Sequence, residues 1–116
     1  MEQPSKLFTL DEANQALGQV RFLVERLQRL QASLLAIENT PGNGNGNGHG
    51  NGHAEFEATL QKLDTLGGVL KDLEQGLVDF YSLRDGDLVF LCWKLGEPSV
   101  GFWHALDTGF ASRQPV

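Results

Sequence analysis

The 116-residue sequence predicts an α+β fold, in which a long antiparallel helical hairpin packs on a small three- to four-stranded antiparallel β-meander. Three observations predict it. Apolar residues recur every seven positions in the first third of the chain, which is typical of a helix with one buried side. A shorter segment with helical spacing follows. The last fifty residues alternate apolar runs with turn signals. We expect a single domain over residues 1–116, since domains of this size are common.

The first helix is predicted over residues 7–38. Thr9 and Glu12 have the spacing of a capping box, in which the hydroxyl accepts from the Glu12 backbone N–H and the carboxylate reaches back to Thr9. The helix is expected to end before Asn39 and Pro41. The two apolar rows are Ala13, Val20, Leu27 and Leu34, and Ala16, Leu23, Leu30 and Ile37.

A flexible Gly/Asn linker is predicted over residues 40–53, because glycine loses the most backbone entropy on ordering. Its two histidines are interpreted as solvated. A second helix is predicted over residues 54–66, ended by Gly67-Gly68. This helix is about half as long as the first, so part of the first helix must pack on something else.

Residues 67–116 are predicted to form the C-terminal β-meander and tail. Asp85-Gly86 between two apolar runs indicates a tight hairpin, because that turn needs positive φ. A second turn is expected at residues 96–99. Residues 69–75 also fit a continuation of the helix. The expected strands cover residues 69–72, 77–82, 88–95 and 100–106.

The register of these strands decides which polar side chains meet. A two-residue loop at Asp85-Gly86 places Asp79 opposite Cys92. In the next hairpin, a four-residue loop pairs Cys92 with Trp103, whereas a five-residue loop pairs Cys92 with His104. A slip of one residue changes every neighbour. In the second register, Asp79, Cys92 and His104 form a row across three strands.

That row has two chemical interpretations. His104 would lower the pKa of Cys92 while Asp79 orients the imidazole, as in a nucleophilic site. Alternatively, the three side chains would be ligands of a divalent metal ion such as zinc. Cysteine is also a common small buried residue, and the sequence has no C-x-x-C spacing, so a structural role stays open. No cofactor is predicted, and a bound divalent metal ion is the alternative.

Four further residues are candidate contacts to a ligand or partner. Trp93 and Trp103 either form an aromatic surface or pack inside the domain. Glu97 beside the second turn is either a solvated carboxylate or a ligand at the rim of a site. Arg113 in the tail is expected to pair with a carboxylate such as Asp79 or Glu97, or with an anionic ligand.

Composition excludes several classes of protein. The chain has 15 acidic and 9 basic side chains, so its net charge of −6 argues against nucleic-acid binding. No apolar run approaches the roughly 20 residues of a membrane helix, and the N-terminus lacks a signal peptide. One cysteine cannot form an intrachain disulfide, which fits a cytoplasmic protein. Phosphate-binding glycine motifs and the G-x-S-x-G motif are absent.

Two blocks of sequence resemble a known family. Residues 8–14, Phe-Thr-Leu-Asp-Glu-Ala-Asn, and the C-terminal block containing Leu91-Cys92-Trp93, Gly96-Glu97, Trp103-His104 and Arg113 are similar to the bacterial domain-of-unknown-function family 2203. The family pattern has proline where this chain has Tyr81, and another near Gly18. The resemblance implies a small bacterial cytoplasmic protein with no established activity, so it brings no catalytic residues.

The sequence favours a non-enzymatic binding or interaction module. We expect it to self-associate through the unpaired apolar stripe of its first helix, as a homodimer, or to bind another protein. The alternative is a metal- or small-ligand-binding protein with a site on the C-terminal sheet.

Overall fold

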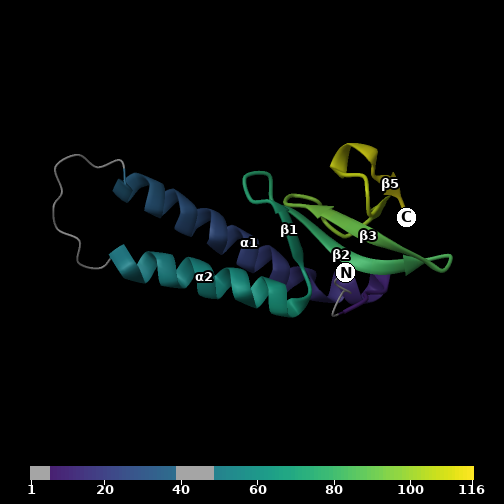
Figure 1. The fold of residues 1–116 in the computed structure, drawn as a ribbon, viewed down its shortest axis with the longest axis horizontal. Coiled ribbons are helices and arrows are strands. Elements are labelled where there is room, and N and C mark those ends of the chain that lie inside the picture. Colours follow the sequence, from purple (N-terminus) through teal and green to yellow (C-terminus); the bar gives the residue numbers. More distant parts are fainter. Residues whose placement is uncertain (1–5, 39–48) are drawn as a thin grey trace.

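The computed structural model describes residues 6–38 and 49–116. Two helices pack on a five-stranded antiparallel sheet (Figure 1), which confirms the α+β prediction with one or two strands more than expected. The elements are α1 (Leu10–Glu38), α2 (His49–Leu66), β1 (Val69–Asp72), β2 (Leu77–Arg84), β3 (Asp87–Lys94), β4 (Phe102–Ala105), a 3-10 turn η1 (Phe110–Ser112) and β5 (Gln114–Pro115).

Helix α1 begins with the predicted capping box. The Thr9 N–H donates to Glu12 Oε1 at 2.9 Å, and the Glu12 N–H donates to Thr9 Oγ1 at 3.1 Å. The helix starts at Leu10 and not at residue 7, because the Phe8 N–H is bonded to the Tyr81 carbonyl oxygen. The chain before the cap is therefore extended alongside β2.

Helix α2 begins at His49, five residues before the predicted start at 54. A Cβ added at Gly52 would lie 2.9 Å from a Leu34 methyl group, so the first turn of α2 packs closely on α1. Packing of this kind overrides the low helix propensity of glycine. The linker prediction is thus wrong for residues 49–53, and residues 40–48 lie outside the described residues.

Helix α2 ends as predicted. Gly67 has φ 102°, and its N–H donates to the Asp64 carbonyl, while the Gly68 N–H donates to the Leu63 carbonyl. This glycine cap stops the helix. The following residues form strand β1, so the alternative of a continued helix over residues 69–75 is wrong.

The sheet is a meander with the strand order β1-β2-β3-β4-β5. The β2–β3 hairpin has the predicted register, with Asp79 opposite Cys92, and its turn residues Asp85 and Gly86 both have positive φ. Strand β5 was not predicted, because it is only two residues long and pairs Pro115 with Phe102.

Both predicted registers for β3 and β4 are wrong. Cys92 pairs with Phe102, and His104 pairs with Phe90. The segment between β3 and β4 is longer than the predicted turn at residues 96–99, because the side chain of Asn14 in α1 binds the backbone of Val100. The Val100 N–H donates to Asn14 Oδ1 at 2.7 Å, and the Asn14 amide donates back to the Val100 carbonyl at 3.3 Å. Strand β4 therefore begins at residue 102, two residues later than predicted.

The core lies between α1, α2 and one face of the sheet. Its members alternate along β2 and β3 as expected for one buried face. They are Phe8, Ala13, Leu17, Val20, Leu23, Val24, Leu27, Leu63, Val78, Phe80, Leu91, Trp93 and Val100.

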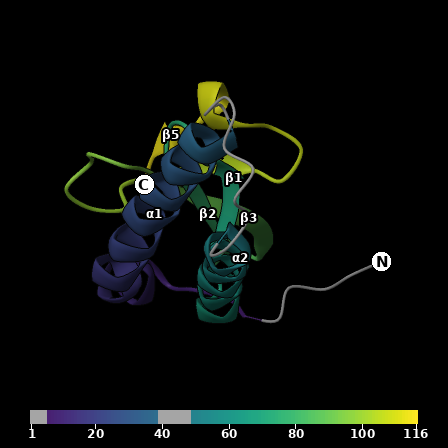
Figure 2. The same ribbon diagram turned by 90° about the vertical axis from the view of Figure 1, so that its left-hand side faces the viewer.

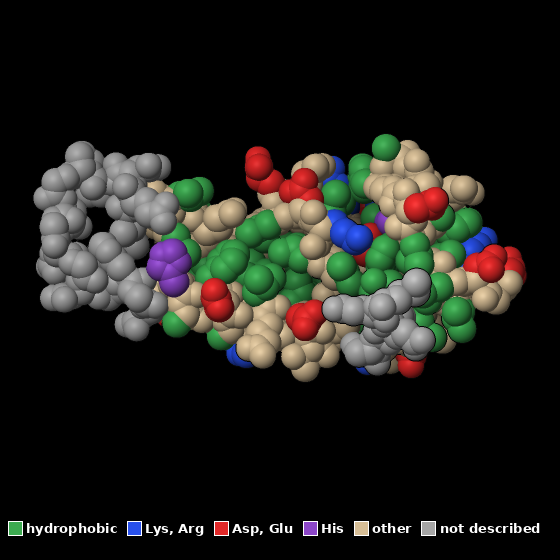
Figure 3. All heavy atoms as spheres, viewed as in Figure 1, with side chains coloured by type: hydrophobic (Ala, Val, Ile, Leu, Met, Phe, Trp, Pro, Cys, Tyr) green, Lys and Arg blue, Asp and Glu red, His purple; other side chains and the backbone are tan. Residues whose placement is uncertain are grey.

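The helical hairpin extends well past the edge of the sheet (Figure 1), and Figure 2 shows α1 and α2 lying side by side along it. Hydrophobic side chains gather along the seam between the two helices where the sheet does not cover them (Figure 3). Neither helix, within the residues that are described, is long and apolar enough to cross a membrane.

Candidate functional site

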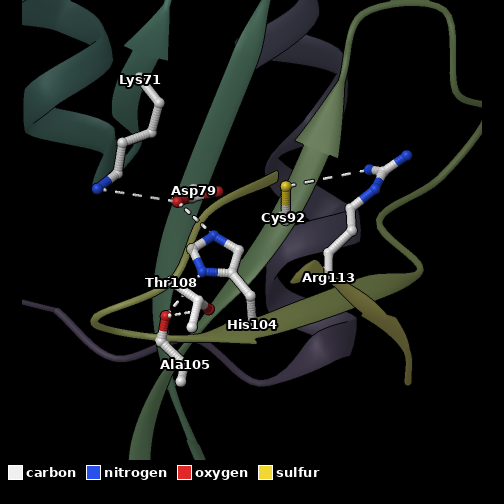
Figure 4. A network of polar contacts seen from close by, with 7 residues as sticks. All are labelled: Lys71, Asp79, Cys92, His104, Ala105, Thr108 and Arg113. Atoms are coloured by element: carbon white, nitrogen blue, oxygen red, sulfur yellow. Dashed lines mark hydrogen bonds and ion pairs between the residues drawn. The ribbon is translucent and has the colours of Figure 1, made fainter. Parts of the chain in front are cut away.

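Three polar side chains meet on the face of the sheet opposite the helices (Figure 4). Asp79, Cys92 and His104 come from β2, β3 and β4, and their exposed fractions are 2%, 1% and 2%. One donor atom of each side chain lies within 4.8 Å of the other two. The three residues that the sequence placed in one row thus do lie together, with Asp79 opposite Cys92 as predicted but with His104 opposite Phe90 and not opposite Cys92.

His104 reaches Asp79 across the central strand β3. Its Nε2 lies 2.8 Å from Asp79 Oδ2, and its Nδ1 lies 2.8 Å from the Ala105 carbonyl oxygen. A carbonyl oxygen only accepts, so Nδ1 carries a hydrogen and donates it. A second proton must lie between Nε2 and the carboxyl oxygen, because neither atom could otherwise donate at this distance. The imidazole is held firmly on both sides.

Two residues from neighbouring segments complete the surroundings. The Lys71 Nζ of β1 lies 3.9 Å from Asp79 Oδ2, and the side chain of Lys71 is 42% exposed. The Thr108 hydroxyl donates to the Ala105 carbonyl at 3.1 Å, the same oxygen that His104 uses. A pocket of about 80 Å³ lies beside the three donors, between Lys71 and the chain at Thr108 to Phe110.

Burial raises the pKa of the Asp79 carboxyl, and the neighbouring His104 and Cys92 oppose this rise only in part. Burial, together with the Asp79 carboxylate, raises the pKa of the Cys92 thiol to about 12. A thiol with this pKa is protonated near neutral pH. This direction is opposite to the one that the predicted nucleophilic arrangement requires, in which His104 lowers the pKa of Cys92.

A second polar pair adjoins the cluster. The Arg113 guanidinium contacts both carboxylate oxygens of Glu97, with Nη1 donating to Oε1 at 3.0 Å, and Nη1 also lies 4.0 Å from Cys92 Sγ. Burial pushes the Glu97 pKa upward, but bonds from Arg113 and the Lys94 N–H hold it below its usual range. The hydrogen bond to Glu97 raises the pKa of Arg113. The predicted pairing of Arg113 with Glu97 is confirmed.

The model of one protein family, described as "Uncharacterized conserved protein (DUF2203)", matches residues 6–116. The chain belongs to the DUF2203 family. No curated protein and no solved structure matches it. The family description names no activity for DUF2203 proteins.

The two tryptophans of this DUF2203 chain lie away from the cluster. Trp93 is 0% exposed in the core, and its indole N–H donates to the Glu97 carbonyl at 3.0 Å. Trp103 pairs with Leu91 on the helix-facing side of the sheet, and the Arg84 guanidinium stacks over its ring. The structure thus separates the candidate site into the cluster with Glu97 and Arg113 on one face, and the tryptophans on the other.

Sequence reasoning missed Lys71, the Ala105 carbonyl and Thr108. Lys71 reaches the cluster because the β1–β2 register shifts between Leu70 and Asp72, and no local sequence signal marks that irregularity. In the sequence, Thr108 is one polar residue of a mostly polar tail, and nothing there assigns it to the cluster. A Thr three residues after Ala105 suits a turn hydrogen bond, so this contact had a weak signal.

The donor set of the DUF2203 site fits a divalent transition-metal ion. A thiolate, an imidazole nitrogen and a carboxylate oxygen are the three ligand types that Zn²⁺ takes in proteins. His104 has its Nδ1 bonded to a carbonyl, which is the usual outer-shell arrangement of a metal-binding histidine and leaves Nε2 directed at the other donors. Asp79, Cys92 and His104 would hold the ion.

Proposed function

We propose that this protein is a binding module, not an enzyme, and that it binds one divalent transition-metal ion of the zinc class through Asp79, Cys92 and His104. The observation that carries the proposal is the convergence of three buried donor atoms within 4.8 Å. Their ligand types differ from those of Ca²⁺ or Mg²⁺ sites, which use oxygen atoms almost alone.

Charge balance supports a dication. Without metal, the Cys92 thiol is neutral, and Asp79 and His104 share one proton and are neutral together. With metal, a thiolate and a carboxylate carry two negative charges, which a divalent ion cancels. Metal binding therefore exchanges two protons for one dication and leaves the buried site neutral, so no uncompensated charge is created in the protein interior.

The neighbouring cations can accommodate this exchange. The Lys71 ammonium is held by Asp79 at 3.9 Å on a side chain that is 42% exposed, so it can move into solvent when the carboxylate binds an ion. Arg113 keeps its own partner in Glu97. Neither cation must be buried unpaired in the metal-bound protein.

The test is a titration of the full untagged chain with Co²⁺ after removal of metal by a chelator. Co²⁺ occupies zinc-type sites, and a thiolate ligand gives it a charge-transfer absorption band. We expect about one ion per chain. Cys92→Ser should remove the thiolate band, and His104→Gln should weaken binding by more than the 10- to 100-fold typical of outer-shell changes.

The matched control is His53→Gln. It changes an exposed histidine of α2, whereas the three donors lie on β2, β3 and β4. It should leave stoichiometry and spectrum unchanged. The proposal is overturned if the chain binds no Co²⁺ or Zn²⁺, or if the spectrum of Cys92→Ser equals that of the wild type. Location in the bacterial cytoplasm is part of the same proposal, because a thiol ligand stays reduced there.

Self-association through the helices is a second candidate function. It is favoured by Phe22 on α1, whose side chain is 58% exposed beside an apolar groove of the hairpin. Large exposed aromatic side chains next to apolar depressions are typical of protein interfaces.

A further inference from the structure

The hairpin carries a groove between α1 and α2 on the side away from the core. The groove has a volume of about 780 Å³, and Gly18 and Phe22 of α1 line it together with Ala58 and Lys62 of α2. At 100° per residue, Phe22 lies about 140° around α1 from the core residue Leu17, so the groove faces away from the sheet. Its lining is mainly apolar or uncharged, since Lys62 is the only charged residue in it.

This surface holds both a projection and a recess. Phe22 projects with 58% of its side chain exposed. One helical turn earlier, Gly18 has no side chain, and, apart from its chain neighbours and the adjacent backbone of α1, no described residue comes within 4 Å of the position of an added Cβ. Gly18 and Ala58 therefore leave a shallow depression next to a side chain that is more than half exposed.

Resting on the proposed self-association, we propose that the occupant of this groove is a second copy of the same chain. The two hairpins pack about a two-fold axis, and Phe22 of each copy inserts over Gly18 of the other. A two-fold interface requires one patch that is complementary to itself, and a projection beside a recess on the same helix meets that requirement. The result is a four-helix bundle, a common arrangement for paired helical hairpins.

The charge distribution fits a second copy. The chain has a net charge of −6, yet no acidic residue lines the groove. Two copies can therefore approach through the groove itself without placing carboxylates opposite each other there. Next to the groove, Glu55 of α2 is already paired with Arg26 of α1 at 2.8 Å. The single cation, Lys62, sits at the side of a groove that is otherwise neutral.

The available area fits a dimer of moderate affinity. Helix α2 has 18 residues and is about 27 Å long, and two adjacent helices span about 20 Å, so the projected face is about 540 Å². Standard interfaces bury about 800 Å² per partner. The hairpin face is somewhat smaller, which predicts a reversible dimer that forms at micromolar concentration.

Sedimentation velocity on the full chain from about 1 μM to about 1 mM tests the proposal. The wild type should shift from monomer to dimer over this range. Phe22→Glu should raise the dissociation constant at least about 30-fold, as loss of an interface hot spot does. Leu35→Glu is the matched control: Leu35 is 51% exposed on the same helix but lies at the angular position of Leu17, away from the groove, so dimerisation should not change.

Gly18→Gln separates interface loss from unfolding. The added side chain has open space in the monomer, and glutamine is a better helix former than glycine, so the thermal midpoint should rise while dimerisation weakens. A wild type that stays monomeric up to about 1 mM overturns both self-association and this interface. A wild-type dimer that Phe22→Glu and Gly18→Gln leave unchanged, or that Leu35→Glu disrupts, overturns this interface alone.

Discussion

Cys92 should react much more slowly with an uncharged disulfide reagent, such as dithiodipyridine, in the native protein than in the unfolded chain. Burial and the Asp79 carboxylate raise the pKa of its thiol from 9.0 to about 12. Because the thiolate is the reactive form, the direction of this shift is protective. The native reaction rate should rise about tenfold per pH unit between about pH 7 and pH 10 without reaching a plateau.

The magnitude follows from two opposing effects. A rise of about three pKa units lowers the thiolate fraction about 1,000-fold near pH 8. The more basic thiolate is intrinsically more nucleophilic, with a Brønsted coefficient of about 0.4–0.5. This raises the reaction rate about 20- to 30-fold and so offsets part of the loss. The net expectation from ionisation is a rate about 30- to 50-fold below that of the thiol in urea. The 1% exposure of Cys92 adds to this slowing by limiting access.

The assay is the release of thiopyridone near pH 8, followed in buffer and in concentrated urea. Asp79→Asn is the informative variant, because it keeps the shape of the side chain and removes the negative charge that opposes ionisation. It should accelerate the native reaction and leave the urea reaction unchanged. The reasoning is refuted if native and unfolded rates agree, or if the native rate levels off below about pH 9.

Three further predictions concern the supports of the sheet and the proposed metal site. Asn14→Ala should destabilise the protein by about 1–3 kcal/mol in urea unfolding, because it leaves the buried Val100 N–H without its acceptor. A loss of stability below a few tenths of a kcal/mol would contradict the supporting role of Asn14. Gly76→Ala should lower the free energy of unfolding by more than about 1 kcal/mol, since Gly76 has φ +71° and an added Cβ would lie 2.5 Å from the Leu95 Cβ. The control Gly101→Ala has open space for its Cβ and should change stability little. Equal effects of the two substitutions would refute the steric argument. Zn²⁺ affinity should rise at least about tenfold per pH unit near neutral pH, because the Cys92 thiol, whose pKa is about 12, must lose its proton, and calorimetry in buffers of different ionisation enthalpy counts the protons released; release of no protons would refute the exchange.

The parts of the fold that the sequence predicted depend on neighbours in the chain. The capping box joins Thr9 to Glu12, and the tight turn depends on Asp85 and Gly86 alone. Once that turn is placed, the antiparallel register follows from counting, and it puts Asp79 opposite Cys92. The placement of two of the three donors, Asp79 and Cys92, therefore followed from local sequence alone.

The parts that the sequence did not predict depend on distant contacts. The register of β4 is tied to the bonds between Asn14 and Val100, which are 86 residues apart. Helix α2 begins early because Gly52 packs on Leu34 of α1. Propensity favours a linker at that glycine, and packing outweighs it by supplying contacts that a local pattern does not contain.

The corrected register changes the chemistry of the same three residues. In the predicted row the imidazole faces Cys92, and a protonated imidazole there would favour a reactive thiolate. In the structure Phe90 lies opposite His104, so the imidazole passes over β3 to Asp79, and the carboxylate is the ionisable neighbour of the thiol. A carboxylate disfavours a second negative charge, which keeps the thiol protonated until a cation neutralises both groups. The arrangement therefore suits a site that gains its thiolate together with a metal ion better than one that holds a free nucleophile.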